Sequence, residues 1–405
     1  MTIFKFQILL VLFITSLSSV LTLEEAFAWN YLHFPNGTVP SDFVPIIPSS
    51  FEVYKKRIFV AIPVVGETPV TLGYVNFPVK NNTIQPYPDE TSQKNITSSI
   101  YIKKDKFDRL WVLDCGAVDI LGDKIQINPP KLLTYSLTTN QLIRTFTFPK
   151  NQYTNDSLFV YLAVETVTEQ DTFVYIADIA NNLLVYDWKQ NTSKVISDET
   201  FKHNPNHVNF EGINNNYNYP RGLSSMSLTG LDKNNYSTLY YNPLASVDQF
   251  AVNTRYLRDS NYTSNAFVKL GTRSSNKQIS TSAYYPEKDI LFYGLAHKGL
   301  VYCWNSHNNY EEKNLIVLYN ASERLPTLDD MKVDGNKLWL FSNQFTSSKS
   351  ERLFVRNVNF RLMIAQISDN IKKCERKIDL ITPSGCTKWF FQYYILIFAV
   401  LIKLL

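Results

Sequence analysis

One short strand motif recurs six times along the 405-residue chain and limits its fold more than any other feature. In each copy a branched or aliphatic residue is followed by an aromatic residue and then by further strand-forming residues. Polar or charged residues precede nearly every copy, which is typical of a turn that leads into a strand. The six copies are Ile58-Phe59, Leu110-Trp111, Val174-Tyr175, Leu239-Tyr240, Leu291-Phe292 and Leu338-Trp339.

A second strand follows several copies after a short polar link and carries a tyrosine, as in residues 72–74, 132–135, 183–186 and 299–302. Two neighbouring strands joined by a turn indicate an antiparallel hairpin. The copies lie roughly 45 to 65 residues apart, which is the span of a four-stranded propeller blade. We therefore predict an all-β fold, a six-bladed β-propeller with four-stranded blades around a central channel. Two β-sandwiches would also give alternating strands, but they do not explain one motif along the whole length.

The composition is that of a folded protein without a nucleic-acid partner. Aromatic residues make up 14% of the chain and charged residues 19%, which suits strands that bury a large core and excludes general disorder. A net charge of +4 is spread thinly, with no long basic run to neutralise phosphates.

Both ends of the sequence are unusual. Residues 1–21 have the layout of a secretory signal peptide, with cleavage expected near Val20 to Thr22; an N-terminal membrane anchor is the alternative. We place the propeller in residues 22–383. Residues 384–405 form a hydrophobic tail, interpreted as a short membrane helix or as a glycolipid-anchor signal attached at Ser384, Gly385 or Cys386. A segment packed on the domain is a third possibility.

Secretion predicts an oxidising compartment in which disulfides and N-linked glycans form. The four cysteines allow three connectivities, of which we favour Cys303 with Cys374, leaving Cys115 and Cys386 unassigned. Eight sequons provide glycosylation sites, although so Asn-rich a chain produces many by chance. They are Asn36, Asn81, Asn95, Asn155, Asn191, Asn235, Asn261 and Asn320.

The usual catalytic motifs are absent from the sequence: there is no G-x-S-x-G elbow, no phosphate-binding P-loop and no H-E-x-x-H helix. His203 and His207 form the only close histidine pair, and the residues between them predict a loop instead of a metal-binding helix. We expect no metal and no cofactor.

Ligands of propellers bind in or near the central channel, so polar residues at the ends of the repeated strands are site candidates: Asp114, Asp178, Asn242, Ser342 and Asn343. Binding of turn backbone groups is the structural alternative for each.

Taken in order, the stretches around these strands resemble the insect yellow and major royal jelly proteins. The resemblance runs from Phe27-Ala28-Trp29 to Asn359-Phe360-Arg361. Its main carriers are residues 86–88, 108–114, 129–133, 175–178, 239–246, 303–305 and 338–343. It implies a secreted six-bladed propeller. Roles of the family include cuticle pigmentation and melanin chemistry, food or eggshell proteins, and binding of biogenic amines in the channel.

Two functional hypotheses follow from this resemblance. The first is a non-catalytic extracellular protein that binds a small aromatic amine or catechol in its channel, or that serves as a component of a matrix, cuticle or eggshell coat. The resemblance implies Asn343 and Phe345 as ligand-binding residues, with Thr327 as a further candidate. The second is an enzyme, a tautomerase of dopachrome-like intermediates, for which Asp114 or Asp178 would act as the base.

Departures from the family pattern limit what carries over. Arg221-Gly222 stands where the family has an Asp-Gly pair, and Cys115 replaces a small polar residue. The fold therefore transfers more safely than the ligand.

The hydrophobic tail generates the first prediction. Phospholipase treatment of intact cells will release the protein if residues 384–405 are a lipid-anchor signal, whereas only detergent will release it if they are a membrane helix. Immunoblotting of the medium and of the cell fraction measures this release. Recovery of all protein from untreated medium would exclude both forms of attachment.

Overall fold

The computed structural model describes residues 23–35, 37, 42–44, 46–78, 82–120, 122–211, 216–259, 263–344, 353–369 and 371–375. The proposed signal peptide (1–21) and hydrophobic tail (384–405), including Cys386, lie outside these residues. Across the described ranges, no helix has the length and apolar character needed to cross a bilayer.

Six four-stranded antiparallel sheets make up the fold and form the six blades of a β-propeller. Their strands, listed from the innermost outward, are as follows. Blade 1 contains β3 (Ser50–Tyr54), β4 (Arg57–Ala61), β5 (Leu72–Asn76) and β6 (Gln85–Pro86). Blade 2 contains β7 (Ser99–Lys104), β8 (Arg109–Asp114), β11 (Lys131–Ser136) and β12 (Leu142–Thr147). Blade 3 contains β13 (Phe159–Thr166), β14 (Thr172–Asp178), β15 (Asn182–Asp187) and β16 (Thr192–Ser197).

The remaining three blades follow the same plan. Blade 4 contains β19 (Leu223–Leu228), β20 (Thr238–Pro243), β21 (Asp248–Asn253) and β22 (Val268–Thr272). Blade 5 contains β23 (Ile279–Tyr285), β24 (Ile290–Leu295), β25 (Leu300–Asn305) and β26 (Ile316–Asn320). Blade 6 contains β27 (Thr327–Asp334), β28 (Lys337–Asn343), β30 (Phe360–Gln366) and, as its outermost strand, β1 (Glu24–Trp29).

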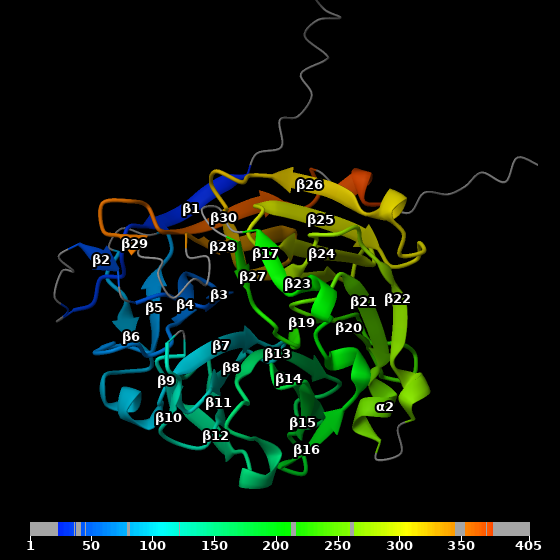
Figure 1. Cartoon of the computed structure of the whole chain (residues 1–405). Coiled ribbons are helices and arrows are strands. Elements are labelled where there is room, and N and C mark those ends of the chain that lie inside the picture. The colour runs from blue at the N-terminus through cyan, green and yellow to red at the C-terminus, as the bar shows by residue number, and fades with distance from the viewer. Residues whose placement is uncertain are drawn as a thin grey trace, which may run out of the picture. The chain divides into compact units, whose positions relative to one another are not determined.

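The innermost strands form a closed ring in which each contacts the next, in the order β3, β7, β13, β19, β23, β27 and back to β3. Figure 1 shows these six strands gathered at the centre, with the other strands of each blade lying farther out. Residues from the two ends of the described chain close the ring, because β1 pairs with β30 inside blade 6. A single sheet therefore holds the first and last strands together without any covalent link.

The repeated sequence motif occupies the second strand of every blade. Its copies lie in β4, β8, β14, β20, β24 and β28, and the tyrosine-bearing strands that follow lie in β5, β11, β15 and β25, paired with them as the expected hairpins. The sequence thus predicted six blades correctly. It did not identify the innermost strands, which precede each copy.

Short strand pairs, a short α-helix and single 3-10 turns lie outside the six four-stranded sheets. β2 (Phe43–Val44) pairs with β29 (Leu353–Phe354) from the far end of the described chain, while two short hairpins pair β9 (Ala117–Val118) with β10 (Ile125–Gln126) and β17 (Asn209–Glu211) with β18 (Asn216–Asn218). One short α-helix, α2 (Thr254–Arg258), follows β21. Single 3-10 turns span Thr91–Asn95, Lys150–Gln152, Glu199–Phe201, Pro205–His207, Ser264–Ala266, Glu312–Asn314 and Ile371–Lys373.

Buried aromatic side chains and buried ion pairs together join neighbouring blades. Trp111 of the repeated motif is fully buried and its indole N–H donates to Asp105 over 2.8 Å. The same carboxylate pairs with Arg109 at 2.7 Å, and Arg109 also donates to Thr172 of blade 3. Each charge is hydrogen-bonded, as a charge removed from water must be. The polar residue that precedes the motif therefore ties blade 2 to blade 3.

A disulfide joins Cys303 of β25 to Cys374, which lies after the last strand, with Cα atoms 5.8 Å apart. The structure thus contains the pair that the sequence analysis favoured. Cys115 is a free, buried thiol whose pKa is raised to about 11 because burial disfavours the thiolate.

This disulfide generates the second prediction. Its half-cystines are 71 residues apart, and a closed loop of this length stabilises a fold by about 2–4 kcal/mol through the unfolded chain. We expect Cys303→Ser/Cys374→Ser to lower the urea-derived free energy of unfolding by that amount. Cys115→Ser is the control for loss of a buried sulfur alone. Equal stability of wild type and the double variant would contradict a structural role for the bond.

Candidate ligand site in the central channel

The carboxylate of Asp330 lies at the centre of the ring and is completely buried. It comes from β27 of blade 6. Its Oδ2 accepts a hydrogen bond from the Ser50 hydroxyl at 2.6 Å and from the Phe51 backbone amide at 3.1 Å, both in blade 1. Its Oδ1 accepts from the hydroxyl of Tyr101, in blade 2, at 3.0 Å. One side chain thus connects three blades.

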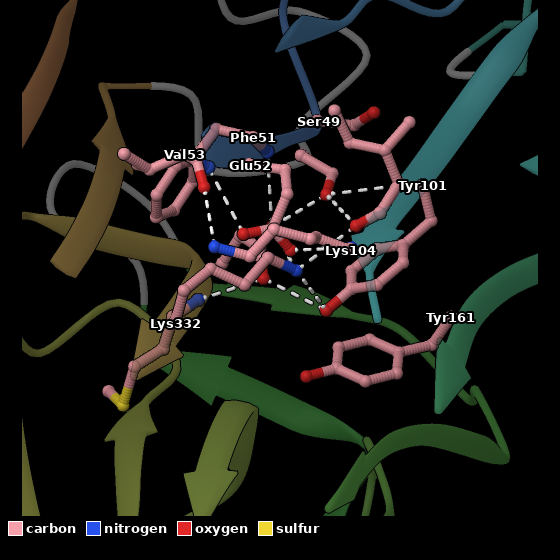
Figure 2. Close-up of polar contacts among 12 residues, drawn as sticks. Ser49, Phe51, Glu52, Val53, Tyr101, Lys104, Tyr161 and Lys332 are labelled. Carbon is pink, nitrogen blue, oxygen red and sulfur yellow. Dashed lines mark hydrogen bonds and ion pairs between the residues drawn. The ribbon is translucent and has the colours of Figure 1, made fainter. Parts of the chain in front are cut away.

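Lys332, two residues further along β27, pairs with this carboxylate. Its ammonium nitrogen is 2.9 Å from Asp330 Oδ2, and it also donates to the Tyr101 hydroxyl at 2.8 Å and to the Ile102 carbonyl at 3.2 Å. All three N–H bonds are therefore satisfied. Burial lowers the pKa of Lys332 to about 8, although the negative charge of Asp330 opposes this shift. Figure 2 shows the lysine reaching toward the Tyr101 ring across the centre.

Neighbouring side chains complete this polar layer. Glu52 accepts from the backbone amides of Val53 and Lys104, at 3.0 and 2.9 Å. Tyr161, from blade 3, lies beside Tyr101 with ring centroids 4.2 Å apart and donates to the Ser282 carbonyl. We name Asp330, Lys332, Tyr101 and Tyr161 the central layer. Because all four residues are less than 10% exposed, the layer divides the channel into a side where the innermost strands begin (the first mouth) and one where they end (the second mouth).

β-bulges shape the first mouth. Five of the six innermost strands carry one near their start, which leaves one residue of each strand unpaired: Ile100, Val160, Ser224, Ser280 and Asp329. A bulge redirects the side chain of the extra residue. Four of these residues are half-buried although the residues beside them in the strand are buried.

Two of the bulge residues carry unsatisfied polar atoms. Ser224 Oγ and Asp329 Oδ2 are shielded from solvent and have no hydrogen-bond partner among the described residues. Burial, and secondarily the charge of Asp330, raise the pKa of Asp329 well above its usual value, while hydrogen bonds from Asn343 oppose the shift. An unpaired buried carboxylate is costly. The first mouth therefore offers an acid without a counter-ion.

Asn343 and Thr327, two of the predicted ligand-binding residues, lie beside Asp329. They are directly paired across β27 and β28, and both are about 5% exposed. Thr327 Oγ1 is 3.1 Å from Nδ1 of His297, whose ring meets the edge of Phe210 at 6.2 Å. Burial lowers the pKa of His297 to about 4, so this ring is neutral at pH 7. The third predicted residue, Phe345, lies outside the described residues.

The carboxylates of Asp114 and Asp178 are held by hydrogen bonds at strand ends, whereas an active-site base needs an oxygen within reach of a ligand. Asp114 accepts hydrogen bonds from the backbone amides of Thr97, Ser98 and Gly116. Asp178 accepts from the Ser157 hydroxyl and from the amides of Leu158 and Ala180. Each carboxylate thus ties the end of a second strand to the start of the innermost strand. Burial raises the pKa of Asp114, against the effect of these amides.

The remaining predicted positions are Asn242, Ser342 and the histidine pair. Asn242 is buried and donates to the carbonyls of Pro243 and Ile279, which fastens blade 4 to blade 5. The hydroxyl of Ser342 is buried and unpartnered among the described residues. His207 ends a 3-10 turn with Pro205, so the segment is a loop as predicted. No group of three or more His, Cys, Asp or Glu within the described ranges is arranged to hold a metal.

Sequence reasoning missed Asp329, Asp330 and Lys332. The segment Thr327–Asp334 is rich in charged residues, which are usually exposed. The position of the segment could have revealed its role. It directly precedes the sixth motif copy, just as each of the other innermost strands precedes its own copy.

The fold and the site define a six-bladed β-propeller whose channel is closed by a polar layer, with an acidic, partly apolar first mouth. A model of the major royal jelly protein family matches residues 97–375. The chain belongs to the yellow and major royal jelly protein family.

The relatives cover most of the chain. Protein yellow of Drosophila madeirensis is 30% identical over 378 residues, which are 86% of this chain and 66% of that protein. Major royal jelly protein 1 of Apis mellifera is 28% identical over 373 residues, 84% of this chain and 85% of that protein. Among solved structures, a luciferin-regenerating enzyme has 9% identity and a TM-score of 0.48, covering 85% of this chain and 95% of that one.

The central layer generates the third prediction. Removing one partner of a buried ion pair costs about 3–5 kcal/mol because the other charge is left uncompensated. We expect Asp330→Asn and Lys332→Met each to lower the free energy of unfolding by this amount in urea. The double variant should lose clearly less than the sum.

Asp334→Asn is the matched control, because it lies on the same strand and pairs with Lys104 at 3.0 Å while remaining 43% exposed. It should cost less than about 1 kcal/mol. Strictly additive losses for Asp330→Asn and Lys332→Met would show that the two residues do not act as a pair.

Proposed function

We propose that this protein is a secreted, non-catalytic propeller that binds a small aromatic amine at the first mouth of its channel. The observation that carries the proposal is Asp329. Its Oδ2 atom is buried without a partner among the described residues, and Asp329 is the extra residue in the bulge of β27. An ammonium group would supply the missing counter-charge.

The rest of the first mouth suits an amine with an aromatic body. Val160 supplies an apolar group from blade 3, whereas Ser224, Ser280 and Asp329 supply polar groups from blades 4 to 6. A ligand with one apolar and one cationic end matches this division.

Neutral groups next to Asp329 favour the same ligand. Asn343 and Thr327 offer an amide and a hydroxyl for the hydroxyl groups of a catechol or indole. His297 carries no charge at neutral pH, because burial lowers its pKa to about 4. It therefore does not repel an ammonium.

Two structural features support secretion. The Cys303–Cys374 disulfide is of a kind that persists in oxidising compartments. The described sequon residues Asn95, Asn155, Asn191, Asn235 and Asn320 are all exposed, as glycan attachment requires.

Calorimetric titration with serotonin and dopamine provides the fourth prediction. We expect binding that weakens at least about tenfold in Asp329→Asn, because the charge-assisted contact is lost. The pKa of Asp329 is raised, so protonation at low pH should weaken binding and affinity should rise with pH. This pH dependence should disappear in Asp329→Asn.

Asp334→Asn serves as the control, since this residue lies at the opposite end of the same strand and should leave amine affinity unchanged. Absence of heat with every amine at micromolar protein would refute the proposal. Equal affinity of wild type and Asp329→Asn would refute the role of the carboxylate.

A further inference from the structure

A separate cavity opens on the other side of the central layer. It has a volume of about 190 Å³ and is lined by Tyr161 of the central layer and, near the ends of the innermost strands, by residues that include Lys103, Ser227, Leu228, Tyr284 and Val333. Tyr101 also lines it, so the central layer forms its roof. The residues of the proposed amine site lie on the far side of that layer.

The charge of this cavity is opposite to that of the first mouth. Among the described residues, its lining contains one cation, Lys103, and no carboxylate. The Lys103 side chain makes no hydrogen bond or ion pair with any other described residue. Two acids of β27 already have cationic partners, because Asp330 pairs with Lys332 and Asp334 with Lys104. The positive charge of Lys103 is one of the effects that disfavour the charged form of Lys332.

The hydroxyl groups of the cavity also have a proton to donate. Ser282 Oγ lies 2.8 Å from Ser225 Oγ and 2.9 Å from Ser227 Oγ. Three hydroxyls share these two hydrogen bonds, which leaves one of their three protons without an acceptor among the described residues. Ser227 and Ser282 both line the cavity. An acceptor brought by a ligand would use this proton.

The volume and the lining residues of the cavity indicate the size and the apolar character of the rest of the ligand. A cavity of about 150 Å³ in a protein interior accommodates benzene, so about 190 Å³ holds a single ring with one small substituent. Tyr161 and Met226 supply polarizable walls, and Leu228 and Val333 supply aliphatic ones. We propose that the second mouth of the channel binds a small aromatic carboxylate, with its carboxylate on Lys103 and the serine hydroxyls and its ring between these apolar walls.

Benzoate is the probe for the fifth prediction. Calorimetry with the full-length secreted protein should show one benzoate site whose affinity falls at least about tenfold in Lys103→Met. Lys103→Arg should retain most of the affinity because it keeps the cation. Cyclohexanecarboxylate and chloride distinguish an aromatic site from a general anion site, and the proposal expects benzoate to bind most tightly.

The two chambers can be tested independently. Asp329→Asn should leave benzoate affinity unchanged, and saturating benzoate should leave serotonin binding in place, since the central layer separates the sites. Thermal melting confirms that each variant folds. No benzoate binding at millimolar ligand, equal affinity of Lys103→Met and wild type, or chloride binding as tightly as benzoate would each overturn the proposal, whatever the outcome for the amine.

Discussion

The buried charge of Asp330 is the constraint on which the rest of the channel depends. A carboxylate removed from water requires compensation from every direction, and here the compensation comes from a lysine on its own strand, a serine and an amide in blade 1, and a tyrosine in blade 2. The serine, the amide and the tyrosine lie far from Asp330 in the sequence. Their convergence requires the ring to be closed between the last blade and the first, so the ion pair and the β1–β30 pairing stabilise the same closed state.

The central layer also gives the channel two unlike halves. Bulges at the start of the innermost strands bring an acid, hydroxyls and an aliphatic residue to the first mouth. At the second mouth, the lining residues that the structure describes include a lysine and no acid. Opposite charge at the two mouths favours different ligands in each. A propeller with a continuous channel would not separate them in this way.

Sequence reasoning predicted the scaffold because its signal is local and repeated. The motif copies bury their aromatic residues, for example Trp111 and Trp339, so every copy must keep its hydrophobic pattern. The innermost strands obey no such rule. Ser50, Ser225 and Asp330 are polar yet buried, since their partners lie in neighbouring blades. Asp114 and Asp178 were correctly noted at strand ends, where their carboxylates bind backbone amides.

The sequence by itself determined the number of blades, their second strands, four of their third strands and the family, because each depends on spacing and residue type along the chain, and it favoured the disulfide that the structure contains. Only the tertiary structure decided which charges are buried and which residues face the channel. Asp329 and Asp330 are adjacent and chemically identical, yet a bulge leaves the first unpaired in the ladder and places the second against Lys332. That difference arises from strand register and from contacts between blades, which a single sequence does not display.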